Sequence, residues 1–388
     1  MSRWRSLTRD VRLARFVARP NRFVARCALE DGSLVDAHLP NPGRMWELLL
    51  PDVQLWLARR RFVPSRSSPP VTGFTVLAVE RSGEPVMLHT HATNDVARHL
   101  IEGGQLPPLG DARVIATEVK RGRSRFDLLL SRRGKEVLCE VKSVTLFGNG
   151  TAMFPDAPTA RGRRHLVELA ESAAAGVKPV VLFLVHTRRV ERFLPDYHTD
   201  LEFARTLLAL RRRLQVVAAA VGWRPRLGLP RRAEVLPIDW RFLARHAQDR
   251  GAYLLLLRLK QRRLVEVGKL GRMAFQPGTW IYVGSAMAGL DARMARHLRR
   301  RKRLHWHVDH LRDVADEARA LPIRSANRLE CSLAAALGAR FSRGPAGFGS
   351  SDCGCSSHLF FHPEDPLADP DLHTLLQRFR MAGAHDAG

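Results

Sequence analysis

Apolar and polar residues alternate in short segments over the first 90 positions, a pattern typical of β-strands that bury one face. Gly, Pro and Asn-Pro turns separate these segments. The segments read RFVARCAL, SLVDAHL, VQLWLARR, TGFTVLAVE and PVMLHT. Short strands joined by tight turns predict a small β-barrel over residues 1–90.

The spacing of the apolar residues changes after the predicted barrel. Residues 94–105 begin with polar side chains, repeat apolar ones at helical intervals and contain two glycines near their end, which predicts a helix. Strand-like runs follow at 113–120, 124–131 and 136–141, then a helix from about Gly162 to Ala175 and the apolar run VKPVVLFLVH. The order α-β-β-β-α-β predicts an α/β domain over residues 91–222.

Residues 223–238 are rich in Pro and Arg without clear periodicity, so we predict a linker over 223–240. A second α/β domain is expected over residues 241–388, which end in a tail with a short final helix. Its predicted strands are AYLLLLRL, RLVEVGKL and WIYVGSA. A basic helix, GLDARMARHLRRRKRLHWHVDHL, should follow, with another helix at about 329–337.

The length of the chain bears on the number of domains, and its charge bears on the kind of partner. A chain of 388 residues exceeds what one hydrophobic core organises, so several domains are expected. It carries 63 basic against 38 acidic residues, a net charge of +25, which favours a polyanionic partner such as nucleic acid. Only seven of the basic residues are lysines, however, and a GC-rich genome alone produces such an arginine bias.

The remaining composition indicates a cytoplasmic protein without a membrane partner. No apolar run approaches the roughly 18 residues of a membrane helix, and the basic N-terminus lacks the apolar stretch of a secretory signal. The few, irregularly spaced cysteines are expected to be reduced thiols. They are Cys27, Cys139, Cys331, Cys353 and Cys355.

The first group of candidate catalytic residues is Asp127, Glu140 and Lys142. Glu140 and Lys142 lie two apart at the end of one strand and share a face, and Asp127 lies on the strand before. Two carboxylates and a lysine suit a divalent metal that activates water against a phosphodiester. Charges on edge strands and structural ion pairs produce the same pattern, so the spacing alone leaves both interpretations open.

The surrounding residues resemble the sugar fermentation stimulation (SfsA) family from about Leu13 to Val221. The resemblance is carried by EVKSVTLFGNGTAMFPDAPTARGRRHL and, upstream, AHLPNPGRM. It implies an OB-like nucleic-acid-binding barrel followed by a nuclease-like domain of the PD-(D/E)XK kind. Asp127 and Glu140 would then be ligands of Mg²⁺ or Mn²⁺, and Lys142 the catalytic lysine.

Further site residues are implied by the same resemblance. Glu118 is the next acidic candidate for the catalytic group, and Arg161 or His165 should face phosphate. In the HLPNPG loop, Asn41 either forms a tight turn or contacts nucleic acid with its neighbour Arg44.

The second α/β domain resembles GIY-YIG nucleases and a related family of uncharacterised domains. The stretches YVGSAMAGLDARMARHLR, HWHVDHL and GFGSSDCGCSSHLF carry this resemblance. It implies that Glu330 holds a divalent ion, Arg293 binds the scissile phosphate, and Tyr253 or Tyr282 helps to activate water. The gap between the tyrosines is longer than in ordinary GIY-YIG proteins, and buried core tyrosines are the alternative.

The sequence leaves the function of two other features undecided. Cys353, Cys355 and His358 offer ligands for Zn²⁺, and His305, His307 and Cys331 are further candidates. C-x-C is tighter than standard zinc spacings, however, and core packing or a redox or substrate-facing role is favoured. The basic run 299–303 and the adjacent Trp306 suit phosphate contact and base stacking, with Arg299 and Arg300 as candidates; a solvated helix end is the alternative.

These features predict a metal-dependent nuclease that acts on nucleic acid, DNA rather than RNA, with an appended GIY-YIG-like module. The alternatives are a DNA-binding regulator of sugar metabolism genes that does not cleave, and a scaffold that recruits repair or RNA-processing proteins.

Overall fold

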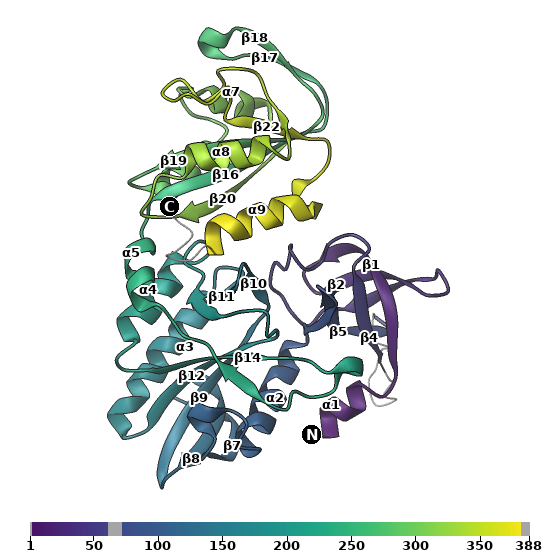
Figure 1. Ribbon diagram of the computed structural model, residues 1–388, viewed down its shortest axis with the longest axis vertical. Coiled ribbons are helices and arrows are strands. Elements are labelled where there is room, and N and C mark those ends of the chain that lie inside the picture. Colours follow the sequence, from purple (N-terminus) through teal and green to yellow (C-terminus); the bar gives the residue numbers. More distant parts are fainter. Residues whose placement is uncertain (1, 61–71, 382–388) are drawn as a thin grey trace. The chain divides into compact units, whose positions relative to one another are not determined.

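The computed structural model describes residues 2–60 and 72–381, and the chain divides into two compact units (Figure 1). Unit 1 comprises Met1–Asp196 and Glu202–Asp239, and unit 2 comprises Tyr197–Leu201 and Trp240–Gly388. Among the described residues, no helix is long and apolar enough to cross a membrane.

A five-strand barrel forms the first part of unit 1. After α1 (Ser2–Leu7), its elements are β1 (Val11–Asn21), β2 (Val24–Leu29), β3 (Leu34–His38), β4 (Gln54–Arg59) and β5 (Phe74–Arg81), and β6 (Glu84–Met87) extends the sheet. The strand order is β3-β2-β1-β4-β5-β6, and β3 also pairs with β5, which closes the barrel. Alternating residues such as Ala25 and Cys27, or Leu55 and Leu57, are fully buried inside it. The predicted barrel is confirmed.

The second part of unit 1 is a six-stranded mixed sheet in the order β15-β14-β12-β9-β8-β7. Its strands are β7 (Arg113–Arg121), β8 (Ser124–Arg132), β9 (Lys135–Val144), β12 (Lys178–Val185), β14 (Gln215–Val221) and β15 (Ala233–Val235). The helices are α2 (Thr90–Glu102), α3 (Ala160–Glu171) and α4 (Leu201–Leu210). The predicted order of helices and strands is confirmed, although α2 begins four residues earlier than expected.

Both faces of this sheet are covered, which explains why β12 is apolar at nearly every position. Val180, Leu182 and Leu184 belong to the core that also contains the buried residues of α2. Phe183 points to the other face, where its ring lies 6.5 Å from that of Phe203 on α4.

Two segments of unit 1 differ from the prediction. A small sheet of β10 (Leu146–Gly148), β11 (Thr151–Phe154) and β13 (Arg192–Pro195) is inserted beside the main sheet. The predicted linker over 223–240 contains a strand, β15, which pairs antiparallel with β14, so this part of the segment is not a linker. Ala233 is buried and its N–H donates to the carbonyl of Gln105, so tertiary contacts order a segment that has no periodicity of its own.

Unit 2 is built on an antiparallel sheet in the order β20-β16-β19-β22-β21. Its strands are β16 (Gly251–Leu259), β19 (Gly278–Ala286), β20 (Glu317–Arg324), β21 (Ser342–Arg343) and β22 (Leu359–His362). Its helices are α5 (Trp240–His246), α6 (Leu290–Leu298), α7 (His307–Val314), α8 (Glu330–Gly338) and α9 (Pro370–Met381). The core on one face contains Leu290 of α6 and Leu311 of α7, while α8 and α9 contact β19 and β20 (Figure 1).

Two predictions for unit 2 need correction. The predicted strand RLVEVGKL is a strand only in its first half, and it does not join the main sheet, in which β16 and β19 pair directly. Its first half is β17 (Arg263–Glu266), which forms a separate hairpin with β18 (Arg272–Phe275). The single basic helix is also wrong, because the chain leaves helical geometry at Arg299 and forms two helices, α6 and α7.

Candidate active site

Asp127 is held on β8 by hydrogen bonds to both of its carboxylate oxygens. Oδ1 accepts from Nδ2 of Asn94 on α2 at 2.7 Å, and Oδ2 accepts from the backbone N–H of Val141 on β9 at 2.7 Å. The side chain is thus fixed between a helix and the neighbouring strand. Asn94 was not among the predicted site residues, although its position in the polar first turns of α2 is a signal that it faces a polar site.

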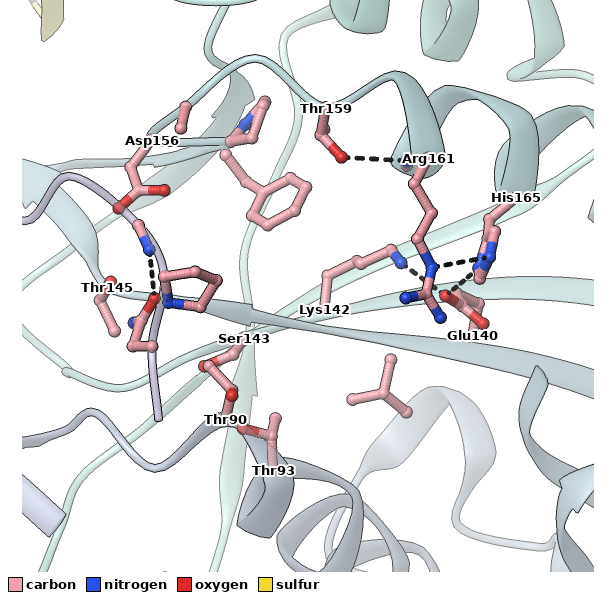
Figure 2. A pocket seen from close by; sticks show the side chains of 18 of the residues that line it. Thr90, Thr93, Glu140, Lys142, Ser143, Thr145, Asp156, Thr159, Arg161 and His165 are labelled. Carbon is pink, nitrogen blue, oxygen red and sulfur yellow. Dashed lines mark hydrogen bonds and ion pairs between the residues drawn. The ribbon is translucent and has the colours of Figure 1, made fainter. Parts of the chain in front are cut away.

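Glu140 lines the same cleft as Asp127, and one of its carboxylate oxygens contacts two side chains. Its Oε1 is 2.5 Å from Nζ of Lys142 and 2.7 Å from Nδ1 of His165 on α3 (Figure 2). His165 accepts from Nε of Arg161 at 3.4 Å through its other ring nitrogen, so its hydrogen lies on Nδ1 and points at Glu140. Oε2 of Glu140 is buried and has no partner.

The two carboxylates respond in opposite directions to this environment. Burial raises the pKa of Asp127 to about 6, and the negative charge of Glu140 adds to the effect. Burial acts on Glu140 in the same upward direction, but the hydrogen bonds and charges of His165 and Lys142 outweigh it, so its pKa is lowered. Close to neutral pH both groups are ionised and repel each other.

These side chains line a cleft of about 650 Å³ whose opposite side comes from the barrel. Asn41 lies there, and its Oδ1 accepts from the N–H of Gly43 at 3.0 Å. A Cβ on Gly43 would lie 2.0 Å from Oδ2 of Asp156, so only glycine permits this approach. Burial raises the pKa of Asp156 to about 6, with the charge of Glu47 acting in the same direction.

The other predicted residues of unit 1 take different positions. Glu118 lies between the paired positions Thr117–Leu128 and Val119–Phe126, hence opposite Asp127, and is exposed at the cleft. Arg161 is exposed at the cleft too, whereas His165 is buried and faces Glu140. Arg44 packs its guanidinium 5.0 Å from the ring of Trp46 and does not line the cleft.

The residues of this cleft fit a divalent cation. Mg²⁺ and Mn²⁺ prefer carboxylate oxygens, and Glu140 offers a buried oxygen without a partner. Asp127 can contribute as well, because each carboxylate oxygen accepts more than one bond. A cation between the two groups would also relieve their repulsion. Asp127 and Glu140 are therefore the residues that would hold the metal.

In unit 2 the predicted residues surround a second cavity, of about 270 Å³. Tyr253 on β16 and Tyr282 on β19 line it with ring centroids 6.4 Å apart, together with Arg293 and Glu330. Both tyrosines are buried, which raises their pKa values. A Cβ on Gly284 would lie 2.3 Å from Oη of Tyr253, so the glycine is required by this packing.

Glu330, in the first turn of α8, accepts a hydrogen bond from Oγ of Ser285. Its Oε1 lies 3.5 Å from Nδ1 of His358. Burial raises the pKa of Glu330, but the contact with His358, the hydrogen bond from Ser285 and the charge of Arg293 outweigh it, so the pKa is lowered and Glu330 is ionised at neutral pH. Ser285, which follows the YVG segment, was not among the predicted residues.

The basic segment after α6 is organised by a buried carboxylate. The side chain of Asp309 is 0% exposed and bonds with Arg296 at 3.0 Å, His297 at 3.0 Å and Lys302 at 3.1 Å. Burial opposes ionisation of Asp309, but these bonds and two backbone N–H groups outweigh it and lower its pKa strongly. Lys302 also donates to the carbonyl of His297 at 2.8 Å, so it closes the end of α6 and turns the chain away.

The residues of this segment that were predicted to contact nucleic acid differ in their exposure and in their contacts. Arg299 and Arg300 are exposed, and Arg300 donates to the carbonyl of Ala315 at 2.8 Å. Trp306 is half-buried, with the guanidinium groups of Arg293 and Arg296 at 4.5 and 4.3 Å from its ring. These cations already occupy the ring that was predicted to stack on a base.

The fold and the first site define a protein in which an OB-like barrel precedes an α/β domain with an acidic, lysine-containing cleft. The chain belongs to the sugar fermentation stimulation protein (SfsA) family. Residues 17–88 match the SfsA N-terminal OB domain, and residues 91–226 match the sugar fermentation stimulation protein RE domain. Residues 252–381 match a domain of unknown function, DUF123.

Individual relatives agree with this assignment. A sugar fermentation stimulation protein homolog of Pyrobaculum arsenaticum is 44% identical over 50% of this chain and 79% of its own length. A homolog of Moorella thermoacetica is 38% identical over 50% of this chain and 82% of its own. Among solved structures, Pyrococcus furiosus SfsA in complex with Ca²⁺ covers 60% of this chain and 96% of its own, with 26% identity and a TM-score of 0.53.

Proposed function

We propose that unit 1 is a nuclease that hydrolyses phosphodiester bonds of nucleic acid with the help of a divalent cation. One observation carries the proposal: Glu140 lines a cleft together with Asp127 and Lys142, and one of its carboxylate oxygens is buried without a partner. The relative from P. furiosus was solved in complex with Ca²⁺, which supports the binding of a divalent cation by this chain. Ca²⁺ and Mg²⁺ both prefer oxygen ligands.

Asp127 and Glu140 would hold the metal, which, when bound, lowers the pKa of water and stabilises charge on the phosphate. The protein's own residues perform the remaining tasks. Asn94 and the N–H of Val141 orient Asp127, and His165 orients Glu140, so neither carboxylate has to reorganise during the reaction.

Lys142 supplies a positive charge at the reacting phosphate. Its side chain lines the cleft and is 15% exposed, and its ammonium is held by Glu140. From there it orients the attacking water and offsets the negative charge that develops on the phosphoryl oxygens. Lysine is suited to this position because it is a compact point charge, whereas the arginines used elsewhere in the chain present a broad planar fork.

The exposed arginines of the cleft would bind the nucleic-acid backbone. Arg22, Arg125 and Arg161 line it, and the chain as a whole carries a net charge of +25. Contacts between such side chains and phosphates release counterions, so affinity should fall steeply as salt increases. DNA is the proposed substrate in preference to RNA, and recognition through the barrel loop at Asn41 is part of the proposal.

The test uses labelled single- and double-stranded DNA and RNA with Mg²⁺, Mn²⁺ or EDTA. Cleavage should require a metal and should disappear in Asp127→Asn, because the substitution removes a charged metal ligand. The hydrogen bonds of this side chain should persist, since Asn94 can rotate its amide. Glu136→Gln is the matched control, since Glu136 lies on the same sheet but is exposed and outside the cleft. Binding without cleavage under every condition would instead support a DNA-binding regulator.

We propose that unit 2 is a second, GIY-YIG-like nucleic-acid module. Its support is the convergence of Tyr253, Tyr282, Arg293 and Glu330 on one cavity. In this proposal Glu330 holds a divalent ion and Arg293 binds phosphate. Glu330→Gln distinguishes cleavage by unit 2 from cleavage by unit 1. Cleavage that survives Asp127→Asn but not Glu330→Gln would place the activity in unit 2.

A further inference from the structure

Four side chains of the kind that binds zinc meet beside the start of α8. Cys331 lies in the first turn of the helix, Cys353 and Cys355 lie in the loop that precedes β22, and His358 ends that loop. The three Sγ atoms and a ring nitrogen of the histidine all lie within 4.8 Å of one another. Sγ of Cys353 is 3.4 Å from Nε2 of His358.

This arrangement is close to the geometry that zinc requires. Tetrahedral Zn²⁺ with bonds of about 2.3 Å to sulfur and 2.0–2.1 Å to nitrogen places its ligand atoms roughly 3.5–3.8 Å apart. Movements of about 1 Å or less in the side chains reach that spacing. Three cysteines and one histidine fill all four positions, which is the composition of a structural site rather than a catalytic one.

Neither core packing nor a disulfide accounts for the four side chains together. Cys331 is exposed and Cys353 and Cys355 are half-buried, so the thiols are not there to fill a core. A disulfide would use two thiols and leave the third and the buried histidine without a function. The tight C-x-C spacing is no obstacle, since the fourth ligand comes from a separate element, α8, rather than from the same loop.

The histidine also has the outer partner that zinc ligands usually have. With Nε2 directed to the sulfur atoms, Nδ1 of His358 faces Oε1 of Glu330 at 3.5 Å. A carboxylate behind a metal-bound imidazole fixes the ring's tautomer and orientation. Backbone bonds hold the loop in place, with the N–H of His358 donating to the carbonyl of Phe348 at 2.8 Å.

We propose that Cys331, Cys353, Cys355 and His358 bind one Zn²⁺ that fastens the loop before β22 to the start of α8. The loop continues into the second cavity, where Gly349, Ser351 and Asp352 form part of the lining. Zinc would thereby fix both this wall of the cavity and, through His358, the carboxylate of Glu330. The four ligands are positioning residues for the unit 2 site, and zinc binding itself does not depend on the proposed nuclease function.

The test measures metal content in the full chain, prepared without an affinity tag under reducing conditions and supplied with Zn²⁺. About one zinc per chain should remain after dialysis, and Co²⁺ in its place should give the visible bands of tetrahedral thiolate coordination. Cys331→Ser with Cys353→Ser should abolish both signals. Cys27→Ala, which removes a buried barrel thiol, should leave both unchanged.

A second variant tests the outer partner. Glu330→Gln should weaken zinc affinity by about 10- to 100-fold, measured by competition with a chromophoric chelator. The proposal is overturned if the unaltered chain retains no more zinc than the double cysteine variant. It is also overturned if the cluster is recovered as a disulfide after reduction and zinc supply. Neither result bears on cleavage by unit 1, which Asp127→Asn tests separately.

Discussion

Replacement of Asp127 by asparagine should stabilise the metal-free protein above about pH 6. Burial raises the pKa of Asp127 from 3.8 to about 6, so the fold disfavours its charged form. The contribution of Asp127 to the free energy of unfolding is therefore most favourable below pH 3.8 and is lost as pH rises through about 6. A shift of about 2 pKa units corresponds to about 3 kcal/mol, which water at the half-buried cleft reduces to about 1–3 kcal/mol.

Asparagine does not ionise, so the variant escapes this loss. Roughly half of the loss falls between pH 5 and pH 8, and Asp127→Asn should therefore gain about 0.5–1.5 kcal/mol over the unaltered protein across that interval. The comparison between two pH values cancels any effect on packing. Urea unfolding in EDTA, with pulsed hydrogen exchange on peptides from β9, reports unit 1 apart from unit 2.

Two controls accompany this measurement. Glu136→Gln removes an exposed carboxylate of the neighbouring strand and should leave the pH dependence unchanged. Excess Mg²⁺ should stabilise the unaltered protein but not Asp127→Asn, because only the former retains both ligands. A stability difference between variant and unaltered protein that is the same at pH 5 and pH 8 would refute the argument that Asp127 is strained by burial and by Glu140.

Three further changes test other contacts. Lys142→Arg keeps the positive charge but should reduce cleavage at least about 100-fold while nucleic-acid binding persists, measured by turnover and by filter binding. Gly43→Ala places a Cβ 2.0 Å from Asp156 and should cost about 1–3 kcal/mol in urea unfolding, whereas Gly73→Ala, with open space around it, should be neutral. Asp309→Asn should cost unit 2 about 3 kcal/mol near neutral pH; because ionisation stabilises the fold here, the loss should shrink only in strong acid.

The barrel and the α/β order could be predicted because both depend on local periodicity, which the chain displays clearly. The group of Asp127, Glu140 and Lys142 was predicted mainly from the resemblance to the SfsA family, because the spacing alone leaves a structural ion pair as the alternative. Lys142 is one of only seven lysines, and its spacing from Glu140 fixes a shared face once the segment is a strand. Neither argument shows that Asn94 contacts Asp127, or that His165, which was expected to face phosphate, contacts Glu140. Both residues come from helices whose packing the sequence pattern does not specify.

The predictions of a linker and of one continuous basic helix were wrong for the same reason, because long-range contacts determine the structure of both segments. The three residues of β15 are too few to show periodicity, and their order depends on β14 and on the carbonyl of Gln105. The continuous basic helix fails because Asp309 collects Arg296, His297 and Lys302 into one buried network. From the sequence alone, these residues are a solvated charged run, since nothing local indicates that a fully buried carboxylate will gather them.

The zinc ligands illustrate the same limit, and they also connect the two halves of the unit 2 site. Cys353 and Cys355 lie close together in the sequence, but their spacing matches no standard motif, and Cys331 is separated from them by α8 and β21. Only the fold brings the third thiol to the other two and sets Glu330 behind His358. Since Glu330 also accepts from Ser285 on β19, one carboxylate joins the proposed zinc site to the tyrosine-lined cavity. Loss of the metal should therefore disturb the orientation of Glu330 before it disturbs the sheet.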